Sequence, residues 1–175
     1  MRRKAIVFSM VFFILLTSLL PGCSNPHDQL GDSMEGYTRM LEGDLPENLR
    51  LTIYYMSTAI LTYVPLSAED LIRCSNTSKI VIEADELATN LGLLKKVDAS
   101  ILQPVQEESY INARLYYVFE VGDSEKLLEV TVTPTHLDKI YGHVVVNGIE
   151  VEDNPIFYEL IIPFLTEDAH NALGI

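Results

Sequence analysis

Basic residues are scarce in this sequence, and their scarcity limits the partners that the protein can have. The 175 residues include 12 Lys and Arg against 25 Asp and Glu, a formal net charge of −13. Nucleic-acid binding needs a basic surface opposite the phosphates, so the composition argues against it. The same deficit argues against electrostatic docking on anionic lipid headgroups. At long range the charge favours a cationic or metal-bearing partner; the alternative is an acidic surface that only keeps the protein in solution.

Recognisable catalytic motifs are also absent. The sequence contains no Gly-x-Ser-x-Gly nucleophile motif, no phosphate-binding loop, no dinucleotide fingerprint and no His-Glu-x-x-His zinc motif. We therefore expect no cofactor, and an enzyme is the less favoured class of protein.

A hydrophobic run long enough to span a bilayer is missing as well. Residues 5–20 form a run of 16 residues in which three carry hydroxyl groups, whereas a spanning helix needs about 20 apolar residues. Three basic residues at 2–4 precede the run, and Pro21 and Gly22 end it. This arrangement is typical of a signal peptide, with an uncleaved membrane anchor as the alternative.

A cysteine stands where the apolar run gives way to polar sequence. The stretch Leu20-Pro21-Gly22-Cys23 resembles the lipobox of bacterial lipoproteins, with Leu at −3, a small residue at −1 and Cys at +1. The resemblance covers only the leader and its cleavage site. It implies that Cys23 receives a diacylglyceryl group, becomes the mature N-terminus and anchors the protein to a membrane. An ordinary secretory leader with a chance cysteine is the alternative.

The expected domain organisation follows from this leader. We expect a lipoprotein signal peptide at 1–22, a lipidated cysteine with a polar tether at 23–46, and a single domain at 47–175. Within the tether, a short helix could begin at Asp32 and Ser33 and end near Gly43. A lipid-linked Cys23 leaves Cys74 without a partner, so stability has to come from packing rather than from disulfides.

The first half of the domain shows alternating and β-branched runs that are typical of strands. We expect strands at 49–55, 59–64 and 79–83. Ser67 and Asp70 resemble a capping box that opens a short helix. A second helix is expected to begin at Asp85 and to bury a leucine at every turn of one face. These leucines are Leu87, Leu91 and Leu94.

Two hairpins are expected in the second half. In the first, strands at 115–121 and 126–132 pair so that Phe119 faces Leu128, Tyr117 faces Val130 and Leu115 faces Val132. In the second, the Asn-Gly pair at 147–148 supplies the two positive-φ residues of a type I′ turn. A final helix is expected with Asn154 as its cap and Pro155 at its first position, and Pro163 should kink or end it. The pattern predicts an α+β fold: a mostly antiparallel sheet with two or three helices packed on one face.

Two groups of side chains could carry chemistry. His143, Glu150 and Glu152 are expected on one sheet face of the second hairpin, where they could ligate a divalent metal or act as an acid–base pair. The alternative is a solvated cross-strand His–Glu pair without further function. Cys74 follows Arg73, which could lower the pKa of a nucleophilic thiol. The alternative is a small buried hydrophobe.

A third group could form a recognition surface. Tyr54 and Tyr116 are expected on the sheet face opposite the main apolar set, together with Arg114 and Glu129. Amphipathic aromatic side chains on an open face are typical of interfaces. The alternative is that a helix covers them.

Three hypotheses for function remain. The first is a lipid-anchored module of the cell envelope that binds a protein, a peptide or a cell-wall fragment, and it requires an exposed patch of tyrosine and apolar residues. The second is an envelope hydrolase or metalloenzyme that uses His143, Glu150 and Glu152. The third is an accessory module of an envelope complex with no ligand of its own. We expect the membrane as a partner through the lipid on Cys23.

Overall fold

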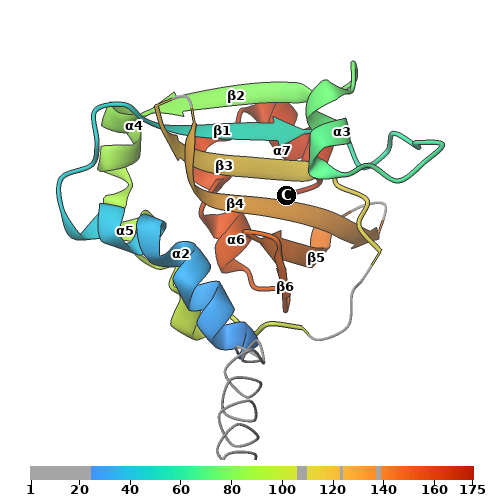
Figure 1. Ribbon diagram of the computed structural model, residues 1–175. Coiled ribbons are helices and arrows are strands. Elements are labelled where there is room, and N and C mark those ends of the chain that lie inside the picture. The colour runs from blue at the N-terminus through green and yellow to red at the C-terminus, as the bar shows by residue number, and fades with distance from the viewer. Residues whose placement is uncertain (1–24, 106–109, 123, 137–138) are drawn as a thin grey trace, which may run out of the picture.

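The protein is built around one antiparallel sheet of six strands. The computed structural model describes residues 25–105, 110–122, 124–136 and 139–175. The strands are β1 (Leu49–Tyr55), β2 (Ser78–Glu83), β3 (Leu115–Val121), β4 (Glu125–His136), β5 (Lys139–Val146) and β6 (Ile149–Val151). Their order across the sheet is β2-β1-β3-β4-β5-β6, and every neighbouring pair is antiparallel (Figure 1).

Helices pack on both faces of the sheet. They are α2 (Pro26–Glu42), α3 (Ala68–Arg73), α4 (Ala84–Thr89), α5 (Leu91–Leu94), α6 (Ile156–Glu159) and α7 (Glu167–Leu173), with 3₁₀ turns η1 (Ala99–Ile101) and η2 (Ile162–Phe164). The expected α+β class with a mostly antiparallel sheet is confirmed. Among the described helices, only α3 packs on the second face; the others add buried residues to the main core. No helix in the described ranges has the length and apolarity needed to cross a membrane.

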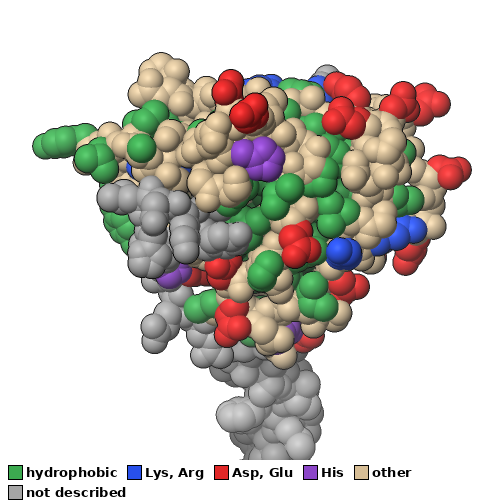
Figure 2. All heavy atoms as spheres, turned by 180° about the vertical axis from the view of Figure 1, so that it is seen from behind, with side chains coloured by type: hydrophobic (Ala, Val, Ile, Leu, Met, Phe, Trp, Pro, Cys, Tyr) green, Lys and Arg blue, Asp and Glu red, His purple; other side chains and the backbone are tan. Residues whose placement is uncertain are grey.

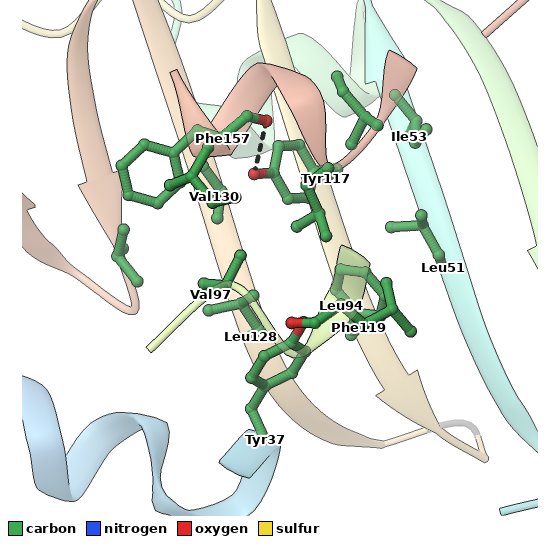
Figure 3. Close-up of a cluster of buried hydrophobic side chains, with 14 of the residues drawn as sticks. Tyr37, Leu51, Ile53, Leu94, Val97, Tyr117, Phe119, Leu128, Val130 and Phe157 are labelled. Atoms are coloured by element: carbon green, nitrogen blue, oxygen red, sulfur yellow. Dashed lines mark hydrogen bonds between the residues drawn. The ribbon is translucent and has the colours of Figure 1, made fainter. Parts of the chain in front are cut away.

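The main core lies between one face of the sheet and these helices. Figure 3 shows Tyr37 of α2 and Leu94 of α5 entering it together with strand residues such as Phe119. The Tyr37 hydroxyl donates to the Leu94 carbonyl at 3.0 Å, and the Tyr117 hydroxyl donates to the Phe157 carbonyl at 3.0 Å. Both phenols are thus buried with a hydrogen-bond partner, which removes most of the cost of burying them.

The β3–β4 hairpin has the expected register over most of its length. Phe119 lies opposite Leu128, Tyr117 opposite Val130 and Leu115 opposite Val132. Nearer the turn, the pairing shifts by one residue between Phe119 and Glu120. The expected pairing of Val121 with Lys126 is therefore wrong: Val121 lies opposite Glu125, because a bulge inserts one extra residue into β4.

The Asn-Gly turn between β5 and β6 is also confirmed. Asn147 has φ +47° and Gly148 has φ +83°, as a type I′ turn requires. Val146 lies opposite Ile149, and Val144 lies opposite Val151. This register places the apolar residues of both strands on the core side.

The expected polar tether at 23–46 is wrong for most of its length. Residues 26–42 form the helix α2, which begins at the Asn25 N-cap and buries Leu30, Met34 and Tyr37 completely. The helix also begins six residues before the expected start at Asp32. Gly31 and Gly36 lower the intrinsic helix propensity of this segment, but burial of its apolar stripe outweighs that cost. The folded domain therefore includes α2 and its N-cap Asn25, which lie well before the expected start at Glu47.

Two other expectations for local structure need correction. The segment 59–64 contains no strand; it belongs to the loop at 56–66 that connects β1 to α3. The single helix expected from Asp85 is two helices, because α4 ends at Thr89 and α5 begins at Leu91. Asp85 lies in the first turn of α4, and Glu83 is the N-cap. The Ser67–Asp70 capping box of α3 is confirmed, with both reciprocal hydrogen bonds present.

Candidate interaction surface

The second face of the sheet, here called the outer face, holds the residues that the sequence suggested for function. Across it, Tyr54 of β1 lies opposite Tyr116 of β3, Tyr116 opposite Thr131, Thr131 opposite Val145, and Val145 opposite Glu150. A smaller core covers one part of this face, formed around Met56, Leu66, Leu71, Ala113, Tyr116 and Val118. The outer face is therefore split between a covered part beneath α3 and a more open part on β4 to β6.

The proposed metal-binding triad is not assembled. His143 Nδ1 lies 3.3 Å from Glu150 Oε1, so the structure brings these two side chains together. Glu152 is exposed beyond the end of β6, and its backbone N–H donates to the Gln103 carbonyl at 2.8 Å. Within the described ranges, no group of three or more His, Cys, Asp or Glu side chains is placed to hold a metal ion. The expected pairing of His143 with Glu152 fails because β6 ends at Val151.

A polar cluster lies in a cleft between α3 and strands β3 to β5. The Tyr116 hydroxyl donates to Glu129 Oε1 at 2.5 Å, and Lys126 Nζ donates to the same oxygen at 2.6 Å. Burial, then the hydrogen bond to Glu129, raises the pKa of Tyr116 well above its ordinary value. The cleft has a volume of about 350 Å³, and Ile72 and Val145 are among its apolar lining residues. Tyr116, Lys126 and Glu129 are thus hydrogen-bonded to one another within the cleft.

Arg114 is a structural residue of the interior. Only 5% of its surface is exposed, and its guanidinium donates to the Asn112 side-chain oxygen, to the Ala113 and Ile60 carbonyls and to the Thr62 hydroxyl. Burial lowers the pKa of Arg114. The bonds to Ile60 and Thr62 tie the loop at 56–66 to the start of β3.

The expected recognition surface of Tyr54, Tyr116 and Arg114 is therefore wrong. Tyr116 is 3% exposed and Arg114 is buried, while Tyr54 is half-buried beside Tyr116 with the ring centroids 6.0 Å apart. Helix α3 and the loop at 56–66 cover these side chains, as the alternative hypothesis required. Because strand alternation specifies only the face, it does not reveal which elements cover that face.

Cys74 is also a packing residue. It is half-buried and lies against the small core of the outer face. Arg73, the residue expected to activate it, instead has its guanidinium 3.7 Å from the Glu69 carboxylate. The structure thus favours the interpretation of Cys74 as a small hydrophobe. Cys23, the expected lipidation site, lies outside the described residues.

An exposed apolar group at the end of the β1–α3 loop was missed by the sequence analysis. Leu61 is 81% exposed, Tyr63 105% and Val64 58%; we call these three residues the apolar tip. The loop projects from the body in Figure 1, and Figure 2 shows hydrophobic side chains standing out at the same place. One sequence signal could have revealed it: no charged residue occurs between Arg50 and Glu69. The β-branched and aromatic residues of 59–64 were instead interpreted as a strand.

Hydrogen bonds hold both ends of the loop that carries the apolar tip. The Thr58 N–H donates to the Ala172 carbonyl at 3.1 Å, the Ala113 N–H donates to the Leu66 carbonyl at 2.8 Å, and the Leu66 N–H donates to the Asn112 side chain at 3.1 Å. Together with the bonds from Arg114, these contacts hold both ends of the loop. The apolar side chains are therefore presented from a braced loop, which suits them for contact with another molecule.

Comparison of the chain with known protein families, with curated proteins and with solved structures finds no match.

Proposed function

We propose that the protein is a membrane-anchored, extracytoplasmic lipoprotein whose domain binds an envelope protein through the apolar tip. The single observation that carries the binding proposal is the exposure of Leu61, Tyr63 and Val64 on one braced loop. Isolated exposed apolar residues are ordinary, but adjacent ones on a projecting loop are typical of contact sites. The lipobox-like stretch ending at Cys23 supports the anchor.

The position of α2 determines how the anchored domain would sit. Two residues, Ser24 and Asn25, separate Cys23 from Pro26, the first residue of α2, so three Cα–Cα steps of the chain, about 10 Å at most, join them. A lipid on Cys23 would therefore hold the folded body against the membrane surface, without a long spacer. In Figure 1 the β1–α3 loop lies well away from the start of α2, so the tip is directed away from this attachment point.

The chemistry of the tip indicates a protein partner with an apolar recess. Tyrosine contributes large contact area at low entropic cost, and it is common among the residues that dominate binding energy. The segment between Arg50 and Glu69 carries no charge, so docking would not bury an unpaired ion. Because Arg114 and the backbone bonds already order the loop, little further ordering is needed on binding.

Site-specific photocrosslinking tests the binding proposal. A photoreactive amino acid replaces Tyr63 in cells of the producing organism, and Tyr110, an equally aromatic residue that is 68% exposed, is replaced as the matched control. We expect one reproducible, identified protein to crosslink from position 63 and not from position 110. That protein, once purified, should bind the native chain and lose at least tenfold in affinity for Leu61→Ser/Tyr63→Ser, since two anchor residues contribute more than about 1.4 kcal/mol.

The two parts of the proposal fail separately. Crosslinks from position 63 to lipid alone, or equal crosslinking from positions 63 and 110, would contradict the protein partner. Mass spectrometry of the protein from its own host tests the anchor: a mature N-terminus at Cys23 with a diacylglyceryl group is expected. An intact Met1 or a bare thiol at Cys23 would contradict the anchor and leave the binding site untouched.

A further inference from the structure

The sheet has one edge that no described part of the chain covers. The β6 edge is occupied, because Pro104 bridges Val151, the Val105 N–H donates to the Glu150 carbonyl and the Glu152 N–H donates to the Gln103 carbonyl. Strand β2 pairs only with β1. Apart from the bonds of the regular strands and helices, the backbone of 78–83 makes no hydrogen bond to another described residue's backbone. In Figure 1 no other strand lies beyond β2. An open edge of this kind is a template for another strand.

The sequence of β2 is complementary to a second copy of itself that runs antiparallel. The sequence Lys79-Ile80-Val81-Ile82-Glu83 has an apolar centre with opposite charges at its ends. In an antiparallel pair of two such strands centred on Val81, each Lys79 lies opposite a Glu83, each Ile80 opposite an Ile82, and Val81 opposite Val81. Opposite charges and β-branched residues placed directly across from each other stabilise a strand pair.

The faces of β2 agree with this register. Lys79, Val81 and Glu83 are exposed, with Val81 at 43%, whereas Ile82 is 2% exposed and belongs to the main core. A two-fold axis perpendicular to the sheet places the same face of both copies on the same side of the joined sheet. Odd-numbered residues of β2 must therefore lie opposite odd-numbered ones, and even-numbered residues opposite even-numbered ones. Pairing centred on Ile80 or on Ile82 would instead place Val81 opposite Lys79 or Glu83. Of these three registers, only the one centred on Val81 places each Lys79 opposite a Glu83.

We propose that the protein forms a symmetric dimer in which the β2 edges of two copies pair antiparallel about Val81. The contact is isologous and closed, so it joins two sheets into one without leading to a filament. Because one short strand pair buries less area than a standard protein interface, the dimer is weak in solution. Attachment of both copies to one surface would raise their effective concentration and favour the dimer. The inference does not depend on the apolar tip.

Lys79 does not protect this edge against pairing. Its ammonium lies 5.3 Å from the centroid of the Tyr54 ring on the neighbouring strand β1, so its charge points along the sheet rather than out from the edge. The flexible stem of a lysine allows the ammonium to turn toward Glu83 of the second copy. The inward-pointing charges, prolines and bulges that commonly protect edge strands are absent from 78–83.

Disulfide trapping tests the register directly. In the full-length chain with Cys74→Ser, Val81→Cys places two thiols on residues whose Cα atoms lie about 4.5–5.5 Å apart across the strand pair, which a disulfide can bridge. Ser100→Cys in the same background is the control, since Ser100 is exposed on η1. Mild oxidation in intact cells should convert most of the Val81→Cys chain to a covalent dimer and little of the Ser100→Cys chain. Equal amounts of dimer from both would overturn the proposal.

Charge exchange tests the proposed partners. Lys79→Glu or Glu83→Lys alone places like charges opposite each other at two symmetric positions, which should raise the dissociation constant of the dimer roughly tenfold. The double variant Lys79→Glu/Glu83→Lys restores opposite charges and should restore dimerisation. Both residues are exposed, so circular dichroism should show an unchanged fold. Sedimentation of the full chain in detergent measures the constant; a monomer at all concentrations, or a double variant as weak as either single one, would overturn the pairing.

Discussion

Buried tyrosines make the main core sensitive to alkaline pH. Tyr37 and Tyr117 are fully buried, and burial raises the pKa of both phenols above the ordinary value of 10.0. Both remain neutral in the folded protein at a pH where an unfolded chain begins to lose these protons. Since the folded state then binds more protons, the free energy of unfolding falls as the pH rises.

Above pH 10 we expect the free energy of unfolding to fall by about 1.4 kcal/mol per pH unit for each of these two phenols. Below pH 10 their contribution should be constant. Urea unfolding between about pH 8 and 11 measures the slope, and absorbance of the phenolate at alkaline pH should rise only as the protein unfolds.

Matched variants identify the source of the slope. Tyr117→Phe should reduce the pH slope of the free energy of unfolding by the contribution of one phenol, about 1.4 kcal/mol per pH unit. It should also lower the stability at neutral pH, because the Phe157 carbonyl loses its hydrogen-bond donor. Tyr63→Phe removes a fully exposed phenol and serves as the surface control for this substitution. An equal effect of both substitutions would show that buried phenols do not govern the alkaline transition.

At the scale of elements, the helix α2 contributes to the main core rather than linking the core to the leader. Met34 is completely buried, so Met34→Ala should lower the free energy of unfolding by about 2–5 kcal/mol. Gly31→Ala should raise it by about 0.5–1 kcal/mol, because a Cβ at Gly31 meets nothing within 4 Å and alanine favours helix. Chemical denaturation measures both. An unchanged stability of Met34→Ala would indicate that α2 does not pack on the sheet.

The β5–β6 turn connects three elements through one side chain. The Asn147 side-chain oxygen accepts from the Glu129 N–H of β4 at 2.7 Å, and its amide donates to the Ser33 carbonyl of α2 at 2.7 Å. Asn147 also has the positive φ that the turn requires. One residue therefore determines both the geometry of the turn and its attachment to the neighbouring elements.

Two substitutions separate these roles of Asn147. Asn147→Gly keeps the positive φ but removes the side-chain bonds, so we expect a loss of about 1–3 kcal/mol from the groups left unpaired. Asn147→Ala removes the bonds and strains the turn as well, which should add about 1 kcal/mol to the loss. Thermal or urea unfolding of both variants gives the difference. Equal stability of the two variants would show that the turn imposes no strain on alanine.

At the scale of the whole molecule, the excess of acidic residues acts on stability. The chain carries 25 Asp and Glu against 12 Lys and Arg, and Figure 2 shows acidic side chains spread over the visible face with few Lys and Arg. Mutual repulsion of these charges disfavours the compact state, and salt screens it. Long-range charge thus opposes folding, and the two hydrophobic cores have to compensate for it.

We therefore expect the melting temperature to rise by a few degrees between about 20 mM and 500 mM sodium chloride. A variant with the exposed acids Glu42, Asp44 and Glu47 changed to their amides should show a smaller rise. Differential scanning fluorimetry can measure both. A melting temperature that falls with salt would indicate that ion pairs such as Arg50–Glu120 outweigh the repulsion.

Local patterns were sufficient for much of the sheet. The alternation in β3 and β4 specified three correct cross-strand pairs, and Asn147-Gly148 specified a turn, because these signals act between neighbouring residues. The sequence analysis predicted only the later part of α2, from Asp32 to near Gly43, and missed its start at Pro26 and its burial in the main core. Its two glycines and polar composition predict little helix when the segment is considered alone. The helix gains its stability by packing on the sheet, which local sequence does not show.

The sequence by itself determined the α+β class, the register of the β3–β4 hairpin away from its turn, and the turn and register of the β5–β6 hairpin. The periods of strands and helices and the conformations of turn residues are local properties, which is why the sequence alone could specify them. Only the tertiary structure decided that Arg114 and Tyr116 are buried, that Leu61, Tyr63 and Val64 are exposed, and that β2 is an open edge. Those properties depend on which distant segments cover each surface, and the same apolar residue fits a buried strand or an exposed loop equally well.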